Sequence, residues 1–335
     1  MNSSKYLRIS LKLLAFFCIA LLVLVIIFFA ITSITPIPIS FVIRKIFDTP
    51  ISTEPNNYFL YENEVSLIKN ISYPSKYKNN VADLYLPKEG SNHPLIIWIH
   101  GGAYVGGDKR DVKEYATVLA ANGYAVFSAN YERAPESKYP NQIRQIEEIY
   151  KFAAKESEKY NLDLNNLFLA GDSAGAHMIS QFALIQTSLE YANIMNFNQV
   201  MDIDTIKGIL LYCGPYNVRK IDEIKNKTIS FLFSQAAWAY FGSKNWQRDF
   251  GDVATIKNHV TAKFPPVFIT DGNSSFKEHA LELIEELRKL NTETDYFFPD
   301  NKSSLHEYQF KLDTDDGMRS IELTLNFLKE KQKTD

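Results

Sequence analysis

Hydrophobicity divides the chain into one long apolar run near the N-terminus and a remainder in which short apolar runs alternate with polar segments. The clearest short run is PLIIWIH, residues 94–100, whose unbroken hydrophobicity is typical of a strand buried on both faces. Five further runs have the length and composition of strands, at residues 124–131, 167–171, 206–214, 266–271 and 294–300.

Amphipathic segments lie between these runs. Pro140 opens the first of them, in which Ile143, Ile146 and Ile149 recur at helical spacing. Residues 276–287 and 318–328 show the same periodicity. This alternation predicts an α/β fold in which helices flank a mostly parallel central sheet.

The long apolar run covers residues 13–32 and contains neither a charge nor a proline. In a helix, such a run matches the hydrocarbon core of a bilayer, which is roughly 30 Å thick. A cleaved signal peptide is the alternative, but its apolar region usually has about 7–15 residues and ends in a small-residue cleavage site. We therefore expect a retained transmembrane anchor.

The charges beside this run predict its orientation. Lys5, Arg8 and Lys12 precede it, and the next basic residue after it is Arg44. Because basic residues favour the cytoplasmic side, we expect residues 1–12 to be cytoplasmic and the rest of the soluble part to be extracytoplasmic. A juxtamembrane connector is predicted at 33–60, followed by the soluble domain at 61–335.

Charge and cysteine content exclude several classes of function. The 36 basic and 39 acidic residues leave a net charge of −3, without the basic patch that a nucleic-acid partner requires. The two cysteines, Cys18 and Cys213, cannot form a disulfide framework. The sequence also lacks a recognisable cluster of metal ligands, so we expect neither a metal nor an organic cofactor.

Ser173 occupies the centre of a GDSAG motif, where the predicted strand 167–171 meets a helical segment. A sharp strand-to-helix turn of this kind presents a nucleophilic serine, and Gly171 and Gly175 avoid a collision with the neighbouring strand or helix. Upstream, strand 94–100 runs into HGGAYVGG. Glycines in that position let backbone N–H groups face a cleft and hold a negatively charged oxygen. The glycine spacing fits no phosphate-binding loop.

The motifs HGGAY, NYERAPESKYP (130–140) and GDSAG occur in an order that resembles the hormone-sensitive-lipase-like branch of the α/β-hydrolase esterases, which includes membrane-anchored arylacetamide-deacetylase-type enzymes. The resemblance spans roughly residues 94–190. It implies that Ser173 is the nucleophile and that the N–H groups of Gly102, Ala103 and Ala174 form the oxyanion hole. Ala103 departs from the family's third glycine, but alanine retains the N–H group.

The order of the α/β-hydrolase triad, serine then acid then histidine, places the general base after the last predicted strand. Among the six histidines, His306 alone meets this requirement. The others lie before or between the strands, in the glycine-rich loop or on helical segments: His93, His100, His177, His259 and His279.

The sequence identifies the triad acid less clearly than it identifies Ser173 and His306. In the stretch ITDGNSSFKEH, the position where the family usually places an aspartate falls on Ser274 or Ser275. Asp271, at the end of the predicted strand, is the nearest carboxylate and is our candidate for the acid. Glu278 and Asp300 remain alternatives.

An aromatic-rich stretch separates the strands that end at 214 and begin at 266. We expect residues 215–262 to form a helical cap whose apolar side chains line a pocket for an acyl or alcohol group. Together these features predict a membrane-anchored serine esterase that hydrolyses small or short-chain acyl esters through an acyl-enzyme. A serine peptidase or amidase on the same fold and a non-catalytic binding protein are the alternatives.

Overall fold

The computed structural model describes residues 3–47, 49–274 and 276–332. Ser275, one of the two serines at the position expected for the acid, lies outside these residues. Eight strands form one sheet in the order β1-β2-β4-β3-β5-β6-β7-β8. Their bounds are Val65–Ser72, Val81–Pro87, His93–Ile99, Ala125–Ala129, Leu162–Asp172, Ile206–Tyr212, Val267–Thr270 and Thr294–Phe297 for β1 to β8.

The sheet is parallel from β4 to β8 and antiparallel only where β2 pairs with β1 and with β4. The prediction of an α/β fold with a mostly parallel sheet is therefore confirmed. The six predicted runs correspond to β3 to β8, although β5 begins at Leu162, before the predicted start, and β8 already ends at Phe297. Strands β1 and β2 were not predicted.

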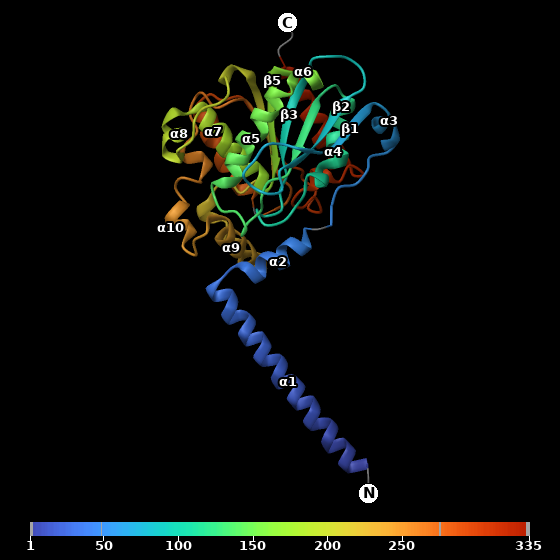
Figure 1. Ribbon diagram of the computed structural model, residues 1–335, viewed down its shortest axis with the longest axis vertical. Coiled ribbons are helices and arrows are strands. Elements are labelled where there is room, and N and C mark those ends of the chain that lie inside the picture. The colour runs from blue at the N-terminus through green and yellow to red at the C-terminus, as the bar shows by residue number, and fades with distance from the viewer. Residues whose placement is uncertain (1–2, 48, 275, 333–335) are drawn as a thin grey trace.

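Helices cover both faces of the sheet (Figure 1). Apolar residues of α5, α7 and α11 join one hydrophobic cluster, and those of α4 and α12 join the cluster on the opposite face. The strands supply both clusters by alternation, since Leu95 and Ile97 of β3 face the first and Ile96 and Trp98 the second. The bounds of these helices, and of the short helices α6 and α8, are α4 Lys113–Ala121, α5 Asn141–Lys155, α6 Ser157–Tyr160, α7 Ala174–Thr187, α8 Leu189–Met195, α11 Lys277–Lys289 and α12 Asp315–Lys331.

The segment between β6 and β7 contains helices α9 (Lys227–Phe241) and α10 (Trp246–Phe250). Aromatic side chains hold it on the body: the rings of Tyr240 and Tyr104 stack with centroids 4.0 Å apart, and Tyr139 packs against Phe241 and Phe250. This segment is called the cap below. Short 3-10 helices complete the chain at Lys109–Val112, Ile203–Thr205, Val218–Lys220, Ile256–Asn258 and Tyr308–Phe310.

Three helices precede the sheet: α1 (Ser3–Ile34), α2 (Ile37–Ile46) and α3 (Tyr58–Asn63). Helix α1 extends away from the body (Figure 1). Its stretch Ile9–Ile34 is largely exposed, apart from Thr32, and has the length and apolar composition of a membrane span, a property that signal sequences share. The region predicted only as a connector thus contains α2, which packs on α9 of the cap through its buried residues Ile39 and Ile43.

Candidate active site

Ser173 lies in a strained turn between β5 and α7, with φ 47° and ψ −117°. Its N–H donates to the Tyr212 carbonyl oxygen at 2.7 Å, which ties the turn to β6. A Cβ atom on Gly171 would lie 2.6 Å from the carbonyl oxygen of Gly175, and one on Gly175 would lie 1.9 Å from that of Ile99. Both glycines are therefore required by close backbone approach, as expected from the sequence, and the packing around them holds the serine in its strained conformation.

His306 lies in the loop after β8, next to Ser173. The Ser173 hydroxyl and His306 Nε2 are hydrogen-bonded at 3.0 Å. Loss of hydration in the cleft lowers the pKa of His306 to about 4, so the imidazole is neutral at ordinary pH and can accept a proton. Its Nδ1 atom has no hydrogen-bond partner among the described residues.

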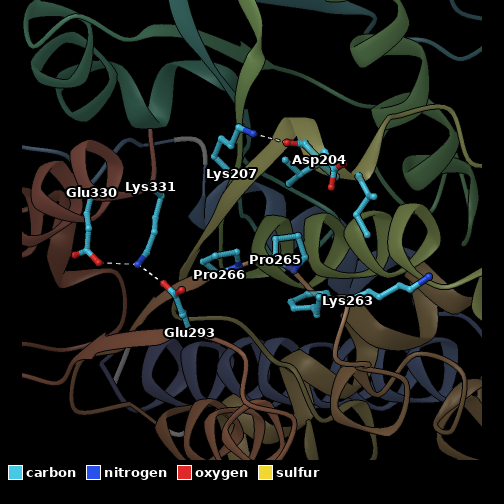
Figure 2. A pocket seen from close by; sticks show the side chains of 11 residues that line it. Asp204, Lys207, Lys263, Pro265, Pro266, Glu293, Glu330 and Lys331 are labelled. Carbon is cyan, nitrogen blue, oxygen red and sulfur yellow. Dashed lines mark hydrogen bonds and ion pairs between the residues drawn. The ribbon is translucent and has the colours of Figure 1, made fainter. Parts of the chain in front are cut away.

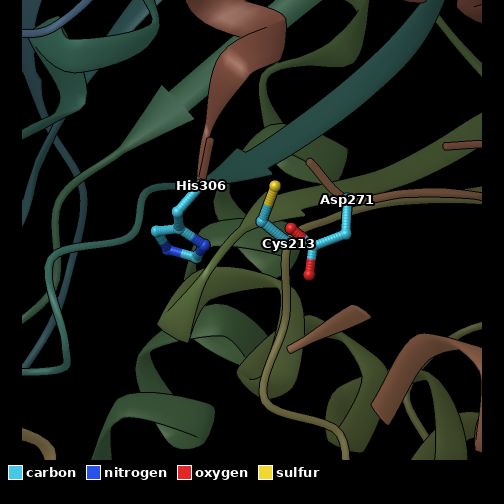
Figure 3. A group of neighbouring side chains, drawn as sticks. All are labelled: Cys213, Asp271 and His306. Atoms are coloured by element: carbon cyan, nitrogen blue, oxygen red, sulfur yellow. The ribbon is translucent and has the colours of Figure 1, made fainter. Parts of the chain in front are cut away.

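Asp271 follows β7 and lies close to this histidine. The ligand atoms of Asp271, His306 and Cys213 all lie within 4.8 Å of one another (Figure 3). The Asp271 carboxylate, however, accepts the Ser274 hydroxyl at 2.8 and 2.9 Å on its two oxygens. Burial raises the pKa of Asp271 to about 7. The structure therefore brings the candidate acid to the base without forming a hydrogen bond between them.

The alternative acids lie in more exposed positions. Glu278 is exposed on α11 at the edge of the cleft, and Asp300 is exposed after β8. Of the three candidates, Asp271 is the one that the structure groups with His306.

The trio of Cys213, Asp271 and His306 is also the set of side chains that could hold a metal ion. A thiolate, a carboxylate and an imidazole are common ligands of Zn²⁺. Burial raises the pKa of the Cys213 thiol well above its usual range, which opposes the thiolate form that such a metal needs. A metal would also compete with Ser173 for the imidazole, so the expectation that the site works without a metal stays a prediction.

The loop after β3 contains the predicted oxyanion donors Gly102 and Ala103. Gly102 has φ 98°, and a Cβ atom there would lie 2.4 Å from the Gly106 backbone, so only glycine fits. Its carbonyl oxygen accepts the N–H groups of Val105 and Gly106. Ala103 takes the left-handed conformation with φ 52°.

Close packing holds the glycine-rich loop after β3 beside Ser173. A Cβ atom on Gly175 would come within 2.7 Å of the His100 carbonyl oxygen, so the first turn of α7 touches the end of β3. Ala174, the third predicted donor, is the first residue of α7. The role of these three N–H groups in binding an oxyanion stays a prediction.

Asp172, next to Ser173, holds the glycine-rich loop that follows β3. Its carboxylate accepts the Gly101 N–H at 2.7 Å and the Trp98 indole N–H at 2.8 Å. His100 also braces the loop, because its ring stacks on Tyr131 with centroids 4.5 Å apart. Asp172 was not among the site residues predicted from the sequence.

Glu307 is a second residue near the site that sequence reasoning missed. It adopts φ 60°, and its carboxyl group is buried beside that of Asp172, with Oε1 3.9 Å from His306 Nε2. Burial and the nearby Asp172 raise the pKa of Glu307 well above its usual range, and burial raises that of Asp172 to about 6. Two buried carboxyl groups this close cannot both ionise readily, so a proton on one of them is favoured.

A cavity of about 620 Å³ lies beside His306. Apolar side chains from the cap, from the residue before α11 and from the His306 loop form part of its wall: Ile224, Ile229, Phe233, Phe276 and Leu305. Charged residues, among them Glu223, Lys225 and Glu278, also line it. Figure 2 shows a larger cavity, of about 740 Å³, lined by charged residues such as Lys207, Glu293 and Lys331. That cavity lies at the start of β6 and β7, whereas Ser173 and His306 follow the ends of strands, so it is remote from the candidate chemistry.

Comparison with known proteins places the chain among α/β-hydrolases. Residues 82–276 match the BD-FAE family. Esterase LipC of Mycobacterium tuberculosis is 30% identical over 204 residues, which cover 59% of this chain and 49% of that protein. An alpha/beta hydrolase of Acanthamoeba polyphaga mimivirus is 30% identical over 110 residues, 32% of each chain. The chain thus spans between about a third and a half of the length of these relatives.

Solved structures show the same fold. The crystal structure of esterase B from Lactobacillus rhamnosis superposes with a TM-score of 0.71 at 20% sequence identity, covering 84% of this chain and 89% of that one. The fold and the resemblance predicted from the three motifs are confirmed. Because the matched residues 82–276 make up more than half of the chain, this protein belongs to the BD-FAE family of α/β-hydrolases.

Proposed function

We propose that this chain is a membrane-anchored serine carboxylic ester hydrolase that acts through an acyl-enzyme on small or short-chain esters. The observation that carries the proposal is the 3.0 Å contact between the Ser173 hydroxyl and His306 Nε2, made from a strained turn beside the glycine-rich loop. The esterase names of LipC and esterase B support the same class of reaction.

The proposed reaction has two halves. Ser173 Oγ attacks the ester carbonyl carbon while His306 Nε2 takes the hydroxyl proton, and the imidazolium then protonates the departing alcohol. Water attacks the acyl-enzyme in the same way and releases the acid. In both halves the N–H groups of Gly102, Ala103 and Ala174 would hold the tetrahedral oxyanion, each donor stabilising the transition state by about 3–4 kcal/mol.

The buried carboxyl pair constrains this chemistry. Gly101 lies between the pair and the proposed oxyanion donors, since a Cβ atom there would lie 2.5 Å from Asp172 Oδ2 and 3.0 Å from Glu307 Oε1. A second negative charge at this point would repel the developing oxyanion and the deprotonating serine. A protonated Glu307 avoids that repulsion and donates a hydrogen bond to Asp172, which holds the loop.

The anchor in this proposal is α1. Its largely exposed apolar stretch, Ile9–Ile34, is long enough to cross a bilayer, and the basic residues Lys5, Arg8 and Lys12 favour a cytoplasmic N-terminus. The catalytic domain would then be extracytoplasmic, on a single-pass membrane protein.

The test of the proposed function compares substrates of the full-length protein in detergent. We expect hydrolysis of p-nitrophenyl esters from acetate to hexanoate, and at least a 10³-fold loss of kcat/KM in Ser173→Ala, as is usual when a catalytic nucleophile is removed. Faster turnover of matched p-nitroanilides would instead identify an amidase or peptidase. Turnover that Ser173→Ala does not change would show that Ser173 is not the nucleophile.

Asp271 is predicted to orient His306 during turnover. Replacing a triad acid by its amide removes the charge but keeps the shape, and can lower kcat by about 10⁴. We expect Asp271→Asn to lower kcat at least a hundredfold with an unchanged melting temperature, and Glu278→Gln and Asp300→Asn to remain near wild type. A large loss in either control with full activity in Asp271→Asn would transfer the role to that residue.

Glu307 is predicted to set the alkaline limit of activity. In the wild type, kcat should fall at least tenfold as the pH rises through the raised pKa of Glu307, because both carboxyl groups then become charged. Glu307→Gln keeps a donor for Asp172 and cannot ionise, so its kcat should match wild type at neutral pH and stay flat at alkaline pH. Glu307→Ala, which loses the donor, should be slower at every pH.

The pH dependence of the free energy of unfolding provides a second test of the raised pKa of Glu307. The folded state keeps a proton on Glu307 that the unfolded chain releases above the ordinary glutamate pKa, so rising pH lowers the free energy of unfolding of the wild type. Glu307→Gln should lessen that pH dependence. An alkaline fall in kcat that is identical in wild type and Glu307→Gln would contradict this role of Glu307.

A further inference from the structure

Helix α2 is apolar on both of its sides. Its inner side buries Ile39 and Ile43 against the cap, while four apolar residues of its outer side are about half exposed: Ile37 45%, Phe41 55%, Val42 45% and Ile46 58%. Neighbouring apolar side chains exposed on a surface usually mark a contact with a partner or a membrane. These four residues are called the outer face of α2, and in this chain they need a further covering.

Helix α2 is fixed rigidly to the body. Arg44 donates from Nε to the Val105 carbonyl oxygen at 2.7 Å and from Nη2 to that of Ala134 at 2.8 Å, and it pairs with Glu136 at 2.6 Å. The Phe47 Cβ atom, just after the helix, lies against Gly106 of the oxyanion loop. The outer face is therefore held in one orientation relative to the catalytic residues.

The end of α1 is tied to the same part of the molecule. Gln235 of α9 donates to the Thr32 carbonyl oxygen at 3.3 Å, and Lys244 donates to that of Ser33 at 2.9 Å. Only Thr35 and Pro36 separate the end of α1 from the start of α2. With so short a link, a bilayer that contains α1 must have its surface next to α2 and α9 (Figure 1).

We propose that the outer face of α2 lies in the headgroup layer of the bilayer that holds α1, so that the catalytic cleft draws its ester substrates from the lipid surface. This inference rests on the proposed function and extends it to membrane-dissolved esters. An interfacial helix of this kind buries its apolar side chains about 5–10 Å into the boundary between headgroups and acyl chains. Lys45, on the same helix, and Lys244, just after α9, are exposed, where basic groups can meet lipid phosphates.

The cap connects this surface to the cleft. Helix α9 packs on α2, supplies Ile229 and Phe233 to the cavity wall, and leaves Phe231 37% exposed. Leu305, on the opposite wall beside His306, is 59% exposed. An apolar path for a substrate thus leads along the cap to the imidazole, next to the helix that we assign to the membrane surface.

The first experiment measures membrane contact without relying on activity. Phe41→Trp and, as a control on the exposed surface of α8, Leu189→Trp are made in the full-length chain and reconstituted into phosphatidylcholine vesicles. Brominated phosphatidylcholine should quench the additional fluorescence of Phe41→Trp and leave that of Leu189→Trp unchanged. Equal quenching of both, or none at Phe41→Trp, would overturn the proposal.

The second experiment measures substrate delivery. Phe41→Glu with Ile46→Glu is compared with Leu189→Glu with Ile194→Glu, whose parent residues on α8 are 65% and 54% exposed. We expect the α2 variant to hydrolyse a vesicle-dissolved oleate ester at least tenfold more slowly and soluble acetate ester at the wild-type rate, with both rates unchanged in the control. Equal rates on the oleate ester in the two variants would overturn the delivery step.

Two other outcomes remain distinguishable. If neither ester is hydrolysed by the wild type, the proposed function fails, and the quenching result alone decides whether α2 contacts lipid. If the outer face is covered by a second copy of the chain, cross-linking through Phe41→Cys in a Cys18→Ser background will be extensive in vesicles and bromolipid quenching will be absent, which overturns the lipid assignment.

Discussion

The contact between Gly175 and the end of β3 is the constraint on which the site depends. The α carbon of Gly175 faces the Ile99 carbonyl oxygen so closely that a Cβ atom would lie 1.9 Å from it. Because α7 meets the end of β3 at this contact, the first turn of α7, the strained Ser173 and the glycine-rich loop after β3 come together at one edge of the sheet. A side chain at this position would separate the proposed nucleophile from its proposed oxyanion donors.

A second constraint is the buried charge of the Asp172 and Glu307 carboxyl groups near that contact. Asp172 uses its carboxylate to hold the Gly101 N–H and the Trp98 indole, and Glu307 reaches the same carboxylate from the histidine loop. The buried carboxyl groups of Asp172 and Glu307 therefore lie where the three segments that carry Ser173, His306 and the glycine-rich loop meet. Burial and the nearby Asp172 raise the pKa of Glu307, which favours a proton on this pair.

Sequence patterns predicted the parts of the fold that local rules determine. Continuous apolar runs marked β3 to β8, and the paired glycines marked the Ser173 turn. Strands β1 and β2 were missed because their pattern is weaker: β1 lies at the sheet edge, alternates irregularly and shifts register between Ile68 and Ile71. The segment that forms α2 was predicted to be a connector. It is short and contains Pro36 and Pro38, and its packing depends on contact with the cap.

The carboxylates of the site were harder to predict for a different reason. Glu307 follows His306 in a left-handed conformation that glutamate rarely adopts, and its contact with Asp172 joins residues far apart in the chain. Asp271 was identified from its place after β7, but its hydrogen bonds to Ser274 depend on a local turn. The position of Asp271 along the chain thus indicated that it lies near His306. The protonation of the carboxyl groups and their hydrogen-bond partners depend on tertiary burial, which the sequence does not show.

The central claim is that His306 activates Ser173 for covalent chemistry. The most direct measurement treats the full-length protein with a fluorophosphonate and locates the adduct by mass spectrometry. The account predicts one adduct per chain, on Ser173, formed at least a hundredfold more slowly in His306→Ala, because the proposed base accepts the serine proton at 3.0 Å. An adduct on a different residue, or equally fast labelling of Ser173 in His306→Ala, would contradict it.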